Sequence, residues 1–196
     1  MKKFIVIDGF DGSGKDTQAQ FVYDLYKNDD KTSKVILRSN PEEDNFFGKT
    51  SHAALLKDGN IHKVIATIFF ALDIFRSLIL YYHKTDVLIF TRYLLASAYF
   101  PMKLVKPVYI IFGFILPKSS FMFYLDLPPE IAMERINART LDTKQEIQTF
   151  ENIKSLKKSR KKVNLISYDW IKIDGSKDKQ LIKEEIANIL LENIEN

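Results

Sequence analysis

The fold of this chain is decided by the stretch Phe4-Ile5-Val6-Ile7-Asp8-Gly9-Phe10-Asp11-Gly12-Ser13-Gly14-Lys15. It opens with four consecutive apolar residues, which are typical of a strand buried on both faces of a parallel sheet. A glycine-rich turn follows, and residues 17–27 then place their apolar side chains on one helical face. A strand, a glycine-rich turn and a helix in this order predict a loop that binds phosphate with its backbone N–H groups and the helix N-terminus.

The turn departs at one position from the pattern G-x-x-x-x-G-K-[ST] of such loops. In that pattern the lysine reaches the terminal phosphates and the hydroxyl binds Mg²⁺. Here Asp16 occupies the hydroxyl position, and Thr17 comes one place late. A glycine-rich turn without a ligand is the alternative, but the flanking strand and helix favour phosphate binding. We therefore expect the phosphates of ATP to bind Gly9, Phe10, Asp11, Gly12, Ser13, Gly14, Lys15, Asp16 and Thr17.

Four further apolar runs alternate with helical patterns along the chain, at residues 35–37, 87–90, 121–127 and 170–173. This alternation predicts an α/β fold with a doubly wound, five-stranded parallel sheet and helices on both faces, in a single domain over residues 1–196. In such sheets, ligands bind at the carboxyl ends of the strands.

The segments between these runs predict helices and one loop. Residues 60–84 are apolar on most sides and predict a long central helix. Residues 39–49, which include Pro41 and three acidic residues, predict a loop over the strand ends. We expect helical pieces over 94–116, a helix that opens at Pro129, and a basic helix over about 149–165.

Composition excludes several classes of site. The chain has 196 residues, of which 46% are hydrophobic and 28% charged, as in ordinary globular proteins. Cysteine is absent, so disulfides, thiolate chemistry and cysteine zinc sites are excluded. His52, His62 and His83 lack the spacing of a metal site. A net charge of +4 indicates an anionic ligand without identifying it.

Two segments suggest a membrane or a nucleic acid as partner, and we favour neither. Residues 64–82 are very apolar, but Asp73 and Arg76 lie near the middle, where lipid would make both costly. The apolar run near the N-terminus is too short for a signal peptide, so we expect a cytoplasmic protein. The basic run 157–162 has no interleaved aromatic residues and predicts a solvated helix face.

Several motifs occur in an order that resembles the thymidylate kinase family of nucleoside monophosphate kinases. They are the glycine-rich loop, Thr91-Arg92-Tyr93, Leu125-Asp126-Leu127-Pro128-Pro129-Glu130 and Ile173-Asp174-Gly175. Residues 38–48 resemble an archaeal branch of that family. The resemblance covers nearly the whole chain. It implies a phosphate-binding-loop kinase fold with a short lid at about 139–149 and Phe150-Glu151 at the start of the following helix.

The resemblance also implies an activity and roles for single residues. We expect ATP-dependent phosphorylation of a nucleoside monophosphate, dTMP first, with Mg²⁺ as cofactor. By resemblance, Lys15 holds the ATP phosphates and Asp11 lies near the acceptor sugar. Arg92 and Arg38 approach the acceptor phosphate, which suits transfer between two polyanions. Phe70 stacks on the acceptor base, or alternatively is a core aromatic.

Two features depart from the family pattern near the acceptor and the lid. Ile74 replaces an arginine of the family, so Arg76 either substitutes for it or forms an ion pair with Asp73. The loop carries no arginine between Gly9 and Lys15, so the transition-state charge is expected from the lid, where Arg135, Arg139 and Lys144 are available. Of these three, Arg135 is most like an ordinary helix residue. We predict that Arg139 is the catalytic one. The resemblance further implies a homodimer, for which residues 108–116 provide either an interface or more core.

The predicted metal site is altered in two places. Asp16 stands where a hydroxyl is usual, and Thr91 stands at the strand end where a carboxylate is usual. These positions lie beside one metal ion in related folds. We predict a reciprocal exchange in which Asp16 and Thr91 still offer Mg²⁺ hard oxygen ligands. The alternatives are a decayed site in a nucleotide-binding switch, and a kinase for another monophosphate or a nucleoside.

Overall fold

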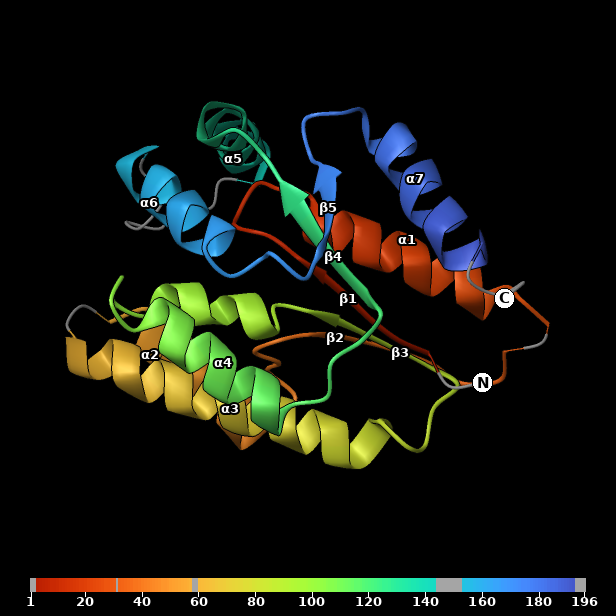
Figure 1. Ribbon diagram of the computed structural model, residues 1–196, viewed down its shortest axis with the longest axis horizontal. Helices are drawn as coiled ribbons and strands as arrows, with labels where there is room; N and C mark the ends of the chain where they lie inside the picture. Colours follow the sequence, from red (N-terminus) through yellow and green to blue (C-terminus); the bar gives the residue numbers. More distant parts are fainter. Residues whose placement is uncertain (1–2, 31, 58–59, 144–152, 193–196) are drawn as a thin grey trace.

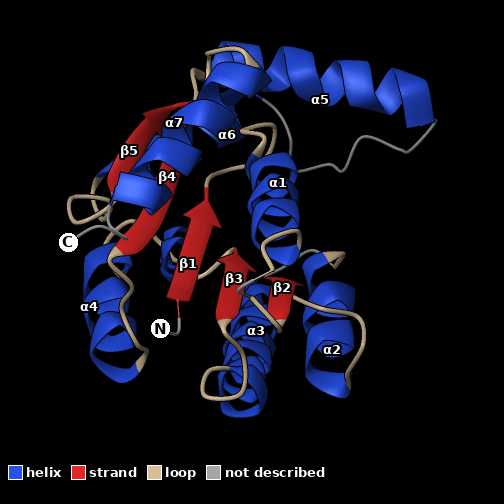
Figure 2. Cartoon of the chain, turned by 90° about the vertical axis from the view of Figure 1, so that its right-hand side faces the viewer, coloured by secondary structure: helices blue, strands red, loops and turns tan. Residues whose placement is uncertain are grey.

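The sheet lies at the centre of the protein. The structure is a computed structural model that describes residues 3–30, 32–57, 60–143 and 153–192. Its five strands are all parallel and run in the order β2-β3-β1-β4-β5 (Figure 2). They are β1 Lys3–Asp8, β2 Val35–Ser39, β3 Val87–Thr91, β4 Phe121–Asp126 and β5 Ile171–Asp174. The doubly wound parallel sheet predicted from the sequence is confirmed.

Side chains of the central strands alternate between two core clusters, one on each face of the sheet. On β1, Phe4 and Val6 contact one cluster, and Ile5 and Ile7 contact the other. The first is covered by α3 (Asn60–Tyr81), the 3₁₀ helix η1 (Leu94–Tyr99), α4 (Val105–Ile115) and α6 (Ile153–Asn164), and the second by α1 (Lys15–Lys27) and α7 (Lys179–Glu192) (Figure 1). Both faces of the sheet are covered, which explains why the central strands β1, β3 and β4 are mostly apolar.

The loop predicted over residues 39–49 is shorter than expected, because the helix α2 (Phe46–Leu55) begins inside it. Asn45 caps this helix, since its Oδ1 accepts hydrogen bonds from the N–H groups of Phe47 at 2.9 Å and Gly48 at 3.1 Å. The helix packs against α3. The loop prediction is therefore wrong from Phe46 onward.

The long central helix α3 ends at Tyr81, three residues before its predicted end. By length and composition alone, Val64–Tyr81 would be able to cross a membrane. In the structure, Phe70, Ile74 and Leu78 pack into the core. Asp73 is fully buried and accepts a hydrogen bond from the N–H of Glu42 at 2.8 Å. These contacts make α3 a core helix of this fold, as predicted.

The helix α5 (Pro129–Thr143) begins at the predicted proline and continues through residues 139–143 of the predicted lid. Residues 144–149 of that lid, with Lys144, lie outside the described residues, as do Phe150 and Glu151. Helix α6 corresponds to the predicted basic helix, and η1 and α4 are the expected helical pieces between β3 and β4.

Candidate active site

The loop between β1 and α1 has the backbone conformation that phosphate binding needs. Gly12 and Gly14 have φ angles of 82° and 87°, in the left-handed region that favours glycine. Gly14 is also the N-cap of α1 and offers no side chain to its first turn. The N–H groups at the start of α1 are therefore suited to an anion. The Phe10 side chain is buried with Leu127 and Ala132, which anchors the loop beneath α5.

Two cationic and two acidic side chains form a charge cluster at this loop. Lys15 Nζ lies 3.2 Å from Asp11 Oδ1 and 3.6 Å from Asp16 Oδ2. Arg92 Nη2 lies 3.5 Å from Asp11 Oδ1, and its Nη1 lies 3.7 Å from Asp16 Oδ1. The cluster thus brings Lys15 and Arg92, from two different parts of the chain, to the same two carboxylates. Their charges are balanced by the two carboxylates.

Electrostatics keep Asp11 ionised in this cluster. Burial by itself would raise the pKa of its carboxyl, but the charges of Lys15 and Arg92 more than offset burial and lower the pKa. Arg139 on α5 contributes to this lowering, so its charge acts on the loop although its side chain is exposed. The structure thus relates Arg139 to the site where phosphates are expected.

Arg92 has an unusual backbone conformation directly after β3. Its φ is 54°, a left-handed value that residues with side chains rarely adopt and that often marks a functional site. Burial tends to lower the pKa of its guanidinium, whereas Asp16 and Asp11 help to raise it, and the net shift is upward. Arg92 is therefore held charged at the carboxyl end of a central strand.

The two predicted metal ligands lie on neighbouring elements. Thr91 immediately precedes Arg92, whose guanidinium contacts Asp16. The Thr91 side chain is fully buried, and its Oγ1 has no hydrogen-bond partner in the part of the chain that the structure describes. That orphaned oxygen fits a ligand position. Within the same described ranges, no three His, Cys, Asp or Glu residues gather as a metal cluster.

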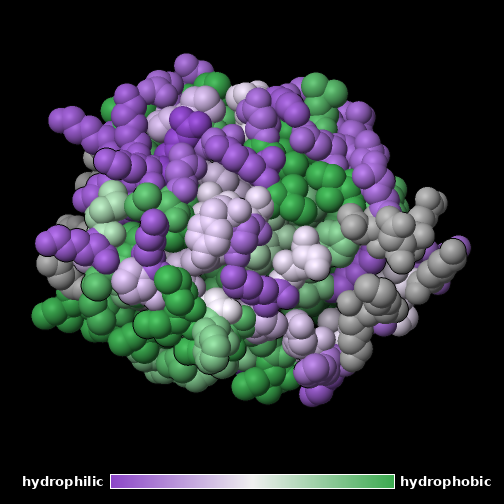
Figure 3. Space-filling view, viewed as in Figure 1, coloured by the Kyte–Doolittle hydropathy of each residue, from purple (hydrophilic) through white to green (hydrophobic). Residues whose placement is uncertain are grey.

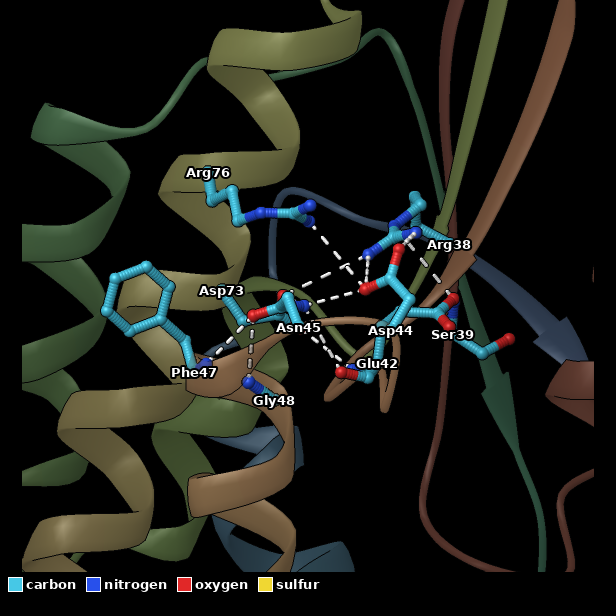
Figure 4. A network of polar contacts seen from close by, with 9 residues as sticks. All are labelled: Arg38, Ser39, Glu42, Asp44, Asn45, Phe47, Gly48, Asp73 and Arg76. Atoms are coloured by element: carbon cyan, nitrogen blue, oxygen red, sulfur yellow. Dashed lines mark hydrogen bonds and ion pairs between the residues drawn. The ribbon is translucent and has the colours of Figure 1, made fainter.

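Arg38, at the end of β2, is held by acidic side chains of the following loop and of α3 (Figure 4). Its Nη1 and Nη2 donate to the two carboxylate oxygens of Asp44 at 2.7 and 3.0 Å. Glu42 lies 3.9 Å and Asp73 4.0 Å from the same guanidinium. The hydrogen bonds from Arg38 lower the pKa of Asp44. Arg38 thus lies at the predicted edge of the sheet, but three carboxylates already surround its charge.

Arg76 was expected either to replace the family arginine or to form an ion pair with Asp73, and among the described residues it forms no such pair. Its Nη1 lies 3.6 Å from Asp44 Oδ1 instead. Asp73 accepts hydrogen bonds from the N–H of Glu42 and, at 2.7 Å, from the side-chain amide of Asn45. Arg76 and Arg38 therefore share Asp44, and Asp73 fixes the loop before α2 (Figure 4).

Known proteins with similar sequences show which family this chain belongs to. The profile of the thymidylate kinase family matches residues 7–186. The chain belongs to the thymidylate kinase family. It is 28% identical over 204 residues to "Probable thymidylate kinase 1" of the archaeon Saccharolobus solfataricus, which covers 99% of this chain and 100% of that protein. It is 35% identical over 77 residues to "Thymidylate kinase" of Leptospira interrogans, covering 39% of this chain and 36% of that protein.

Membership of the thymidylate kinase family makes the chain a nucleoside monophosphate kinase that binds nucleotides and uses ATP as co-substrate. The archaeal resemblance of residues 38–48 agrees with the relative from Saccharolobus solfataricus.

Phe70, expected by resemblance to stack on the acceptor base, is 8% exposed and packs in the core cluster with Ile74 and Tyr93. This placement favours the alternative of a core aromatic, and the stacking role stays a prediction. In the turn after β5, the N–H of Gly175 donates to the carbonyl oxygen of Asp126 at 2.7 Å, which ties this turn to the end of β4.

Two residues that organise the polar contacts after β2, Asp44 and Asn45, were not predicted from the sequence. Asp44 joins Arg38 to Arg76, and Asn45 joins the cap of α2 to Asp73. An Asn immediately before a helical apolar pattern is an N-cap signal that was available in the sequence. The role of Asp44 could not be predicted from local patterns, because it depends on two arginines from other elements. Arg38 lies six residues earlier on β2, and Arg76 lies on α3.

Proposed function

We propose that this chain transfers the γ-phosphoryl group of ATP to dTMP and produces dTDP. The observation that carries the proposal is the convergence of Lys15, at the start of α1, and Arg92, directly after β3, on Asp11 and Asp16. Phosphoryl transfer depends mainly on positioning and on cations that offset the repulsion of two polyanions. The names of the relatives support dTMP as the acceptor.

In this proposal each cationic side chain has one task. Lys15 and the N–H groups of the loop bind the β- and γ-phosphates of ATP, and Arg92 binds the acceptor phosphate. Phosphate oxygens then replace the carboxylates of Asp11 and Asp16 as partners of the two cations, which leaves Asp11 available for the acceptor sugar. Arg139 brings charge from α5 to the transferring group. Arg38 reaches the acceptor only if Asp44 releases it.

Mg²⁺ is part of the proposal, and Asp16 and Thr91 are the residues that would hold it. The buried Thr91 Oγ1, which has no partner among the described residues, fits such a role, and Asp16 adds a carboxylate. A carboxylate and a hydroxyl are hard ligands of the kind that Mg²⁺ prefers. When bound, the ion would screen the charge of the phosphates.

A panel of acceptors tests the function. We would measure turnover with ATP·Mg²⁺ and, in turn, dTMP, AMP, GMP, CMP and thymidine in a coupled assay. We expect the highest kcat/KM with dTMP. A higher value with another monophosphate would assign a different acceptor, for which the absence of the family arginine at Ile74 is the specific reason. ATP binding without turnover on any acceptor would favour the nucleotide-binding switch.

We also propose that the chain works as a cytoplasmic homodimer. Exposed apolar side chains follow one another on α3 at helical spacing, and these are Ile61, Val64, Ile68, Leu72, Phe75 and Ile79. On α4, Ile110, Ile111, Phe114 and Ile115 are exposed as well, and Phe114 is 92% exposed. In Figure 3 apolar side chains gather over these helices along the lower edge. A contiguous apolar face of this kind marks an interaction surface, and a second copy offers the matching one.

A further inference from the structure

Asp8, the last residue of β1, holds two backbone N–H groups from different parts of the site. Its Oδ1 accepts a hydrogen bond from the N–H of Gly9 at 2.8 Å, and its Oδ2 accepts one from the N–H of Tyr93 at 2.9 Å. The register between β1 and β3 ends at the pair Ile7 and Thr91. The side chain of Asp8 therefore extends the connection between these strands beyond the last backbone pair.

We propose that Asp8 is a positioning residue that sets Arg92 against the phosphate loop. Arg92 has a φ of 54°, which is disfavoured for a residue with a side chain, so its turn needs contacts that hold it. The hydrogen bond from Tyr93 fixes the peptide that follows Arg92. This contact sets the direction in which the guanidinium leaves the backbone toward Asp11 and Asp16.

The chemistry of the side chain explains why aspartate suits this position. Asp8 is 3% exposed, so each of its oxygens needs a donor. Burial raises the pKa of its carboxyl, and the N–H groups of Tyr93 and Gly9 partly offset that rise. An ionised carboxylate accepts from both donors, whereas an asparagine offers one oxygen and turns an NH₂ group toward the other N–H. Asp8→Asn therefore keeps the shape and breaks one of the two contacts.

A double-mutant cycle tests the inference, which rests on the proposed role of Arg92 at the acceptor phosphate. We expect Asp8→Asn to lower kcat/KM for dTMP by about 10²-fold, since a misplaced charge has effects of that order. In the Arg92→Ala background, the same change is expected to have an effect below about threefold. Equal effects in the two backgrounds would overturn the inference, because Asp8 would then act independently of Arg92.

The matched control is Asp86→Asn. Asp86 accepts from the N–H groups of Ser33 at 3.1 Å and Lys34 at 2.9 Å, far along the chain from the loop, and its change is expected to leave kcat/KM unaltered. If Asp8→Asn does not fold, the same cycle with Asp8→Glu, which keeps the carboxylate but displaces it, decides the question. The effect of Asp8→Glu on kcat/KM is likewise expected to vanish in the Arg92→Ala background.

A measurement that needs no turnover separates this inference from the proposed function. Hydrogen exchange at the Tyr93 amide is expected to be at least about tenfold faster in Asp8→Asn than in the parent. If the parent phosphorylates no monophosphate, the proposed function fails and faster exchange at Tyr93 still supports the role of Asp8. Unchanged exchange at Tyr93 would overturn that role.

Discussion

At the scale of single residues, the loop between β1 and α1 combines the usual lysine, Lys15, with an unusual aspartate, Asp16, at the position where the pattern has Ser or Thr. Lys15 is 3% exposed and lies between two carboxylates, so it is fixed in place before a nucleotide arrives. Preorganised charge of this kind stabilises a transition state without reorganisation at the moment of reaction.

Lys15→Ala is accordingly expected to lower kcat by about 10²–10³-fold, which is typical for the loss of one preorganised donor. Steady-state kinetics with ATP and dTMP measure the effect, and circular dichroism checks the fold. Lys27→Ala, at the other end of α1, is the control and is expected to leave kcat alone. Near-normal turnover of Lys15→Ala would contradict the proposed role of the loop.

The exchange of Asp16 and Thr91 gives a second prediction at this scale. Asp16→Ala should raise the Mg²⁺ concentration needed for half-maximal activity, because a hard ligand is lost. Thr91→Asp alone should lower Tm, since Thr91 is fully buried and an unpaired carboxylate there is costly, and Mg²⁺ should restore part of the loss. The double change Asp16→Thr with Thr91→Asp should recover much of the activity. If Asp16→Thr alone surpasses the parent, the site is decayed rather than exchanged.

At the scale of helices and strands, the sequence predicts elements that are defined by local patterns and misses those that depend on distant partners. All five strands were predictable from short apolar runs, although only the three central strands β1, β3 and β4 are buried almost throughout. Helix α2 is an exception, because its Asn45 cap is a local signal, but Pro41 and the acidic residues 42–44 that precede the cap indicated a loop. Lys15 and Arg92 were predictable from motifs, whereas one of the two contacts of Asp8 is with a backbone N–H group 85 residues away.

Helix α5 carries the prediction about the lid. Arg139→Ala is expected to lower kcat by roughly 10³-fold with little change in the Kd of ATP, because an arginine supplied in cis acts mainly in the transition state. Arg135→Ala, one turn earlier on the same helix, is the control and is expected to have a small effect. A weaker ATP Kd with unchanged kcat would make Arg139 a ground-state ligand.

The end of β4 carries a prediction about acid stability. Asp126 is 7% exposed and accepts from Arg160 at 2.7 and 2.9 Å, from Tyr124 at 3.0 Å, and lies 2.8 Å from Lys172 Nζ. Burial would raise the pKa of its carboxyl, but the donors Arg160 and Lys172 lower it well below the ordinary range. A lowered pKa stabilises the fold above the unfolded value of about 3.9, and that stability is lost as the pH falls through the folded pKa.

Asp126→Asn is therefore expected to lower the free energy of unfolding by about 1.5–3 kcal/mol at pH 7. The difference from the parent should be about 1 kcal/mol smaller at pH 3, where the unfolded carboxyl is already largely protonated. Urea denaturation at the two pH values measures both quantities, with the exposed Asp30→Asn as control. If the difference in the free energy of unfolding between the parent and Asp126→Asn were the same at pH 3 and pH 7, the ionised carboxylate would not be the source of the stabilisation.

At the scale of the whole molecule, α3 has two apolar faces with different tasks. Phe70, Ile74 and Leu78 pack into the core, while Leu72, Phe75 and Ile79 remain exposed on the other side. This division explains why the helix is apolar on most of its sides. It also separates the surface proposed for the second copy from the phosphate loop at the strand ends (Figure 1).

Charge placed on that exposed face is expected to separate the two copies. Stable dimers bury about 800 Å² on each partner, and a desolvated lysine without a counter-charge at the centre opposes such contact. We expect Phe75→Lys and Phe114→Lys to convert the protein from the mass of a dimer to that of a monomer in sedimentation experiments. Leu181→Lys, at a position 55% exposed on α7, is the matched control and should remain dimeric. A parent that sediments as a monomer at micromolar concentration would contradict the proposed homodimer, and a dimer that survives both lysines would place its interface elsewhere.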